Sequence, residues 1–142
     1  MIAVLEILLR IAGAGLIALA VLHVPIARRL RWREEAARMT EVNAAVFHAH
    51  AFFICVVLLG MGLPALVEPT VFTTPSRAAL WGCGFLTAFW ALRLVAQWTH
   101  YRPSWWRGKR FETVMHWLFT GVWLFLTALF AACTAVQCGW IE

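Results

Sequence analysis

The sequence predicts an all-α integral membrane protein, an antiparallel bundle of four transmembrane helices. The chain is 63% hydrophobic and only 13% charged over its 142 residues. A helix needs about 20 apolar residues to cross a bilayer. Stretches of that kind cover roughly residues 2–27, 42–67, 78–99 and 113–137. Few residues remain outside them, so we expect a single transmembrane domain over residues 1–142.

The first predicted helix, residues 2–27, is interpreted as an uncleaved span and not as a signal peptide. An Ala-Leu-Ala sequence at residues 18–20 resembles a cleavage site. However, Glu6 and Arg10 interrupt the region that should be uniformly apolar in a signal peptide. These two residues are four positions apart, so we expect them to form an ion pair on one helix face.

Proline and glycine separate the other three helices. Pro64, Pro69 and Pro75 surround the connection between the second and third helices, and Pro75 is expected in the first turn of the third. Pro103 and Gly108 interrupt the connection before the fourth helix. This punctuation supports four separate helices.

Basic residues in the connections predict the orientation. They are Arg28, Arg29, Arg31, Arg33 and Arg38 before the second helix, Arg102, Arg107, Lys109 and Arg110 before the fourth, and Arg77 alone before the third. The positive-inside rule puts the two basic connections in the cytosol. We therefore expect a multi-pass protein of the inner (cytoplasmic) membrane with both termini outside. The net charge of +5 serves insertion, and no nucleic-acid partner is expected.

Polar side chains within the apolar segments predict a site near the cytosolic face. The histidines are His23, His48, His50, His100 and His116, each close to an Arg-rich connection. Ionisable groups at membrane depth are costly and commonly line a functional cavity. On the third helix Arg93, Gln97 and His100 are spaced by four and three residues, within an arc of about 60°. They form one polar stripe.

Three histidines on different helices fall at one depth. His23, His48 and His116 lie five, seven and six residues from the nearest charged boundary residue, which is about 7–11 Å along a helix. These three are therefore candidate ligands of a transition metal. Two of them, His48 and His116 or His23 in place of one, are candidate axial ligands of haem b.

The third helix completes the predicted cofactor site. Arg93 would pair with a haem propionate, while Gln97 and His100 would form a hydrogen-bonded route to the cytosol. A snorkelling role, in which Arg93 only reaches the membrane boundary, is an equally good interpretation. His48 and His50 project about 200° apart, so only one can face a small site, and the sequence leaves open which.

Three functions remain open. The leading hypothesis is a haem- or metal-binding redox subunit in quinone-linked electron transfer. The alternative is a non-catalytic assembly subunit of a larger membrane complex, with polar groups that only join helices. A metal-dependent or lipid-modifying enzyme is the third. Partners in addition to the lipid bilayer would be such a complex, a second copy, or a quinone or lipid ligand.

The four cysteines, at positions 55, 83, 133 and 138, contain no CxxC motif. Small apolar packing residues are the favoured interpretation, and a disulfide or redox pair is the alternative.

Overall fold

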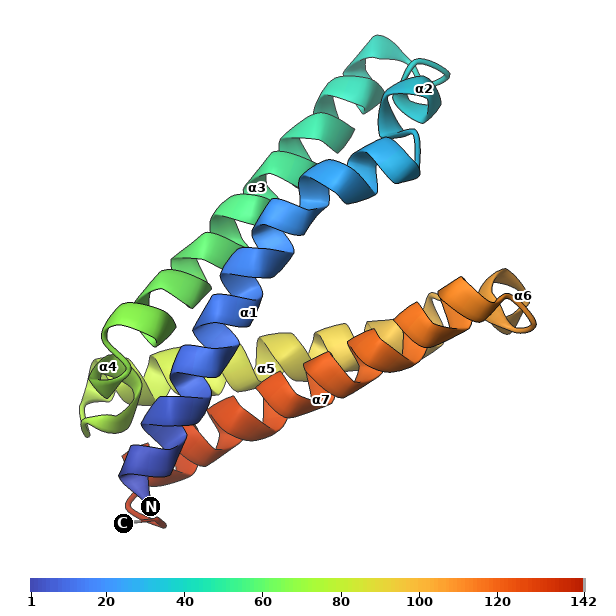
Figure 1. Cartoon of the computed structure of the whole chain (residues 1–142). Helices are drawn as coiled ribbons and strands as arrows, with labels where there is room; N and C mark the ends of the chain where they lie inside the picture. Colours follow the sequence, from blue (N-terminus) through green and yellow to red (C-terminus); the bar gives the residue numbers. More distant parts are fainter. Residues whose placement is uncertain (142) are drawn as a thin grey trace. The chain divides into compact units, whose positions relative to one another are not determined.

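The computed structural model describes residues 1–141, which form four long helices, three short helices and no strand (Figure 1). The long helices are α1 (Ile2–Arg29), α3 (Glu41–Val67), α5 (Arg77–Thr99) and α7 (Arg110–Gln137). The short ones are α2 (Trp32–Ala36), α4 (Thr70–Thr73) and α6 (Pro103–Trp106). All four long helices are long and apolar enough to cross a membrane. The predicted all-α fold class with four membrane-spanning helices is confirmed, and the helix ends lie within three residues of those expected.

The start of α5 differs in one detail from the prediction. The hydroxyl of Ser76 accepts a hydrogen bond from the backbone N–H of Ala79 at 3.0 Å, so Ser76 is the N-cap and the helix begins at Arg77. A side-chain oxygen at this position satisfies one of the free N–H groups of the first turn. Pro75 therefore precedes the helix and does not occupy its first turn.

The helices belong to two compact units. Residues 9–69 form one unit, and residues 1–8 together with the chain from residue 70 onward form the other. The single transmembrane domain expected from the sequence stays a prediction, and each unit is described by itself.

In the unit of residues 9–69, α1 and α3 pack backbone against backbone. A Cβ atom on Gly13 would lie 2.6 Å from the carbonyl oxygen of Gly62 and 2.6 Å from the backbone nitrogen of Leu66, so a larger residue at position 13 would push the two helices apart. One turn earlier, the Arg10 guanidinium donates to the carbonyl of Leu66 at 2.7 Å. The expected ion pair between Arg10 and Glu6 is thus replaced by a helix-to-helix bond. Small residues permit this close approach in membranes.

In the other unit, α5 and α7 form an antiparallel pair (Figure 1). Three polar contacts mark the pairing along its length: Ser76 with Gln137 (2.9 Å), Thr87 with Thr134 (3.2 Å) and Gln97 with His116 (3.1 Å). The residue numbers on α7 fall as those on α5 rise, as antiparallel pairing requires. We call the end that carries residues 100–109 the basic-loop end of this pair, and the end with Ser76 and Gln137 the far end.

The far end is tied to α4 and to the residues that connect it to α5. The Gln137 amide nitrogen donates to the carbonyls of Phe72 (2.9 Å) and Thr74 (3.2 Å), while its oxygen accepts from the Ser76 N–H. The Thr73 hydroxyl donates to Glu6 at 3.1 Å. Side chains here satisfy backbone groups that no helix satisfies.

Candidate functional site

Two buried stripes with seven-residue spacing create a polar centre between α5 and α7. On α5 the stripe is Cys83, Trp90 and Gln97; on α7 it is His116, Trp123 and Phe130. Residues seven apart lie on the same face of a helix after two turns. All six are buried, so the two stripes face the helix interface, and the polar members meet at the basic-loop end.

Gln97 is the centre of the hydrogen-bond network. Its side-chain oxygen accepts from the indole N–H of Trp123 at 3.2 Å and from the Arg93 guanidinium at 3.4 Å. Its nitrogen lies 3.1 Å from Nδ1 of His116. Trp and Arg side chains only donate, so the amide oxygen must face them. The amide nitrogen therefore donates to His116.

This amide orientation assigns the tautomer of His116. Because Nδ1 accepts from Gln97, the proton of the neutral ring is on Nε2. His116 is only 4% exposed, and Nε2 has no hydrogen-bond partner among the described residues. A buried polar atom without a partner is uncommon and calls for an explanation.

Tryptophan rings enclose the His116 ring. Trp106 is stacked on it, with ring centroids 4.1 Å apart and planes 7° from parallel. Trp98 meets it edge-on at 5.1 Å, and Trp117 at 6.0 Å. We call Trp98, Trp106 and Trp117 the aromatic enclosure. It leaves the Nε2–H of His116 in apolar surroundings.

The unpaired atoms in this cluster are all donors. Besides His116 Nε2, the buried side-chain N and O atoms without a partner in residues 1–141 are the indole nitrogens of Trp90 and Trp106. Trp90 stacks on Trp123 at 5.3 Å, and Trp123 bonds to Gln97, so all belong to one network. An indole nitrogen can only donate. The cluster therefore has donor capacity to spare and lacks acceptors.

Arg93 is held by aromatic rings. Its guanidinium carbon lies 4.8 Å from the ring centroid of Trp123 and 5.7 Å from that of Tyr101, and the side chain is half-buried. Such cation–π contacts favour a planar guanidinium over an ammonium. The bond to Gln97 uses one of five N–H donors. Both predicted roles of Arg93, snorkelling and anion binding, stay open predictions.

The remaining predicted site residues have other contacts, each within its own part of the chain. Nδ1 of His23 bonds to the carbonyl of Leu19, and Nδ1 of His50 to that of Val46, both at 2.8 Å within one helix. His48 is exposed. His100 is also exposed, and its Nδ1 lies 2.9 Å from the hydroxyl of its neighbour Thr99. Of the predicted stripe on α5, Arg93 and Gln97 join the network and His100 does not.

The structure gives no support to the predicted metal site. Within residues 1–141, no three His, Cys, Asp or Glu side chains form a group that could hold a metal ion. The metal and haem roles of His23, His48 and His116 therefore stay predictions.

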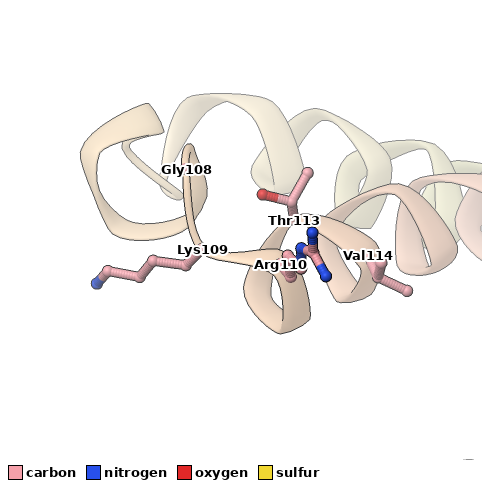
Figure 2. Close-up of a pocket in the computed structure, with 5 residues that line it drawn as sticks. All are labelled: Gly108, Lys109, Arg110, Thr113 and Val114. Atoms are coloured by element: carbon pink, nitrogen blue, oxygen red, sulfur yellow. The ribbon is translucent and has the colours of Figure 1, made fainter.

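A shallow depression borders the site at the start of α7. It has a volume of about 370 Å³ and is lined by Gly108, Lys109, Arg110, Thr113 and Val114 (Figure 2). In Figure 2 the Lys109 side chain extends away from the ribbon. The Thr113 hydroxyl donates to the carbonyl of Trp106 at 2.6 Å. The depression thus adjoins the residue that stacks on His116.

Sequence reasoning missed the tryptophans of this site. Trp98 and Trp106 look like members of a boundary aromatic belt, and Trp123 has no polar neighbour in sequence. One signal was available: Trp123 follows His116 by seven residues, as Gln97 follows Trp90.

Comparisons with protein-family models, curated proteins and solved structures find no match for this chain.

Proposed function

We propose that this chain is a membrane subunit that binds a quinone headgroup at the basic-loop end of α5 and α7, for quinone-linked electron transfer within a larger membrane complex. The positive-inside rule supports a cytosolic position for this end, with both termini outside the inner membrane. The redox partner is then a separate protein of that complex.

The observation that carries the proposal is the buried Nε2–H of His116. A quinone carbonyl oxygen is an acceptor that can pair with this donor, and the flat ring suits an aromatic enclosure of tryptophans. The lipid-soluble tail of a quinone would remain in the bilayer. Arg93 adds positive charge to the same network through its bond to Gln97.

The donor-only character of the cluster gives a preference between redox states. A quinone has two carbonyl acceptors, whereas the reduced quinol carries hydroxyl groups that need acceptors of their own. The unpaired buried atoms of the described residues are all N–H groups. The site is therefore expected to bind the oxidised form more tightly than the reduced form.

Haem ligation by His116 would require a different pattern of hydrogen bonds at its two ring nitrogens. A metal-binding imidazole offers the lone pair of one nitrogen and donates the other N–H to an acceptor. Gln97 donates to Nδ1 of His116, which is the opposite arrangement, whereas His23 donates Nδ1–H to a carbonyl and has Nε2 free. Haem ligation by His116 would require the Gln97 amide to rotate away from Trp123.

The assembly-subunit alternative is favoured by the histidines outside the network. His23 and His50 bond to carbonyls of their own helices, and His100 bonds to Thr99. Such pairing satisfies a polar group without any chemistry. At these three positions no ligand is needed to explain the side chain.

Binding of a short-chain benzoquinone tests the proposal. The protein would be purified into nanodiscs of quinone-free lipid, and quenching of tryptophan fluorescence would be titrated with the oxidised and the reduced compound. His116→Phe keeps a flat ring to stack on Trp106 but removes the donor. We expect saturable binding that weakens about 3- to 30-fold in His116→Phe, the equivalent of one hydrogen bond of roughly 0.7–2 kcal/mol.

The matched control is His100→Phe, an exposed histidine at the same end of the helix pair, which should bind as the wild type does. Circular dichroism would verify the helical content of each variant. Equal affinity of wild type and His116→Phe, or no saturable binding, would reject the quinone site. An absorption spectrum with a Soret band would support the haem hypothesis instead.

A further inference from the structure

Two buried cysteines face each other across α5 and α7. Cys83 on α5 and Cys133 on α7 are both 0% exposed. One turn beyond Cys83, the Thr87 hydroxyl lies 3.2 Å from that of Thr134, which is the residue next to Cys133. This contact fixes the two helices in a register that puts the cysteines at one level.

A second set of contacts places the two cysteines around Phe72. The Cys83 thiol donates to the backbone carbonyl of Phe72 at 3.7 Å. The Phe72 ring packs edge-on against Phe130 at 5.6 Å, and Phe130 is one turn before Cys133. Phe72 and Phe130 thus contribute to the surroundings of both cysteines in the interface of α5 and α7.

The other two cysteines have no such partner thiol. Cys55 donates to the carbonyl of Ala20 at 3.8 Å in the unit of residues 9–69, and Cys138 is exposed at the C-terminal cap of α7. Packing alone explains a single buried cysteine. It does not explain two buried cysteines at one level of the interface between two helices.

We propose that Cys83 and Cys133 are a dithiol that is oxidised to a disulfide linking α5 to α7. A disulfide of about 2.05 Å spans Cα–Cα distances of about 4.4–6.8 Å, so cysteines at one level of two packed helices are within its reach. The pair is six residues into α5 from its start, near the far end. In the orientation proposed above, this end is on the outer side, where disulfides persist.

The oxidant is a protein disulfide of the outer compartment. A thiolate of one cysteine attacks that disulfide, forms a mixed disulfide and releases one oxidant thiol. The second cysteine then attacks its partner's sulfur and releases the other oxidant thiol, so the protein loses two electrons and two protons. Both sulfurs are buried once the helices pair. The reaction therefore precedes the packing of α5 on α7.

Counting free thiols tests this inference. Full-length protein would be acid-quenched in its membranes, denatured, and treated with a maleimide-polyethylene glycol that adds mass for each free thiol. Of the four cysteines, wild type should show two adducts before reduction and four after reduction with dithiothreitol. Cys83→Ser should show three in both samples.

The double variant Cys55→Ser with Cys138→Ser is the control for pairing. It should show no adduct before reduction and two after, because only Cys83 and Cys133 remain. Four adducts on unreduced wild type would overturn the inference, and so would a reduction-sensitive pair that survives in Cys83→Ser. The inference rests on the proposed orientation and not on the quinone site, and thiol counting involves no quinone, so the two proposals fail separately.

Discussion

Replacement of Gly13 by alanine tests the close contact between α1 and α3. The new Cβ would lie 2.6 Å from two backbone atoms, the Gly62 oxygen and the Leu66 nitrogen, about 0.8 Å closer than the 3.4 Å at which ordinary contact begins. Backbone atoms cannot move aside as a side-chain end can, so the helices must separate. A gap of 0.5–1 Å forfeits roughly a quarter to a half of each dispersion contact.

The expected cost follows from that separation. Overpacking typically costs about 1–3 kcal/mol, and the backbone contact favours the upper half of this range. Alanine is a better helix former than glycine by up to about 1 kcal/mol, which offsets part of the cost. We therefore expect Gly13→Ala to destabilise the α1 and α3 pair by about 1–2 kcal/mol.

The reporter is Cys55, whose thiol contacts the Ala20 carbonyl across the same pair of helices. With the other three cysteines replaced by alanine, its maleimide labelling rate in mild detergent measures opening of this interface. A loss of 1–2 kcal/mol predicts labelling that is about 5- to 30-fold faster. The control is Gly15→Ala, where an added Cβ meets nothing within 4 Å. Equal labelling rates in the two variants would refute the contact.

Two further predictions concern the charge and the orientation. Arg93→Lys should insert normally into the membrane but bind quinone several-fold more weakly, because an ammonium loses the planar contact with Trp123 and Tyr101. Unchanged quinone binding would leave Arg93 a snorkelling role only. A reporter that is active only outside the cytosol, fused after residue 142, should be active, and activity of a cytosolic reporter there would reverse the proposed topology.

The fold class could be predicted from the sequence because bilayer thickness and the cost of unpaired backbone groups leave few solutions. The ends of individual helices were harder to predict. Pro75 suggested the start of α5, but the hydroxyl of Ser76 caps the helix and sets its first residue. Helix ends depend on single capping contacts, which composition does not reveal.

The site was only partly predictable. Arg93 and Gln97 on α5 share a face by spacing alone, and the network confirms that they interact. The role of His116 could not be derived in this way, because its tautomer depends on which side of the Gln97 amide faces Trp123. The orientation of this amide is set by contacts between α5 and α7. A sequence pattern describes the faces of one helix at a time and does not reveal such contacts.

The bonds made by Gln137 constrain the order in which the protein can be completed. The carbonyls of Phe72 and Thr74 and the N–H of Ser76 find their partners on a side chain more than sixty positions later in the chain. Exposed backbone groups are not tolerated in hydrocarbon. During synthesis this segment must therefore stay hydrated at the membrane surface until the last helix has emerged and inserted. A chain shortened before Gln137 should leave the segment exposed to proteases, even with three helices already in the bilayer.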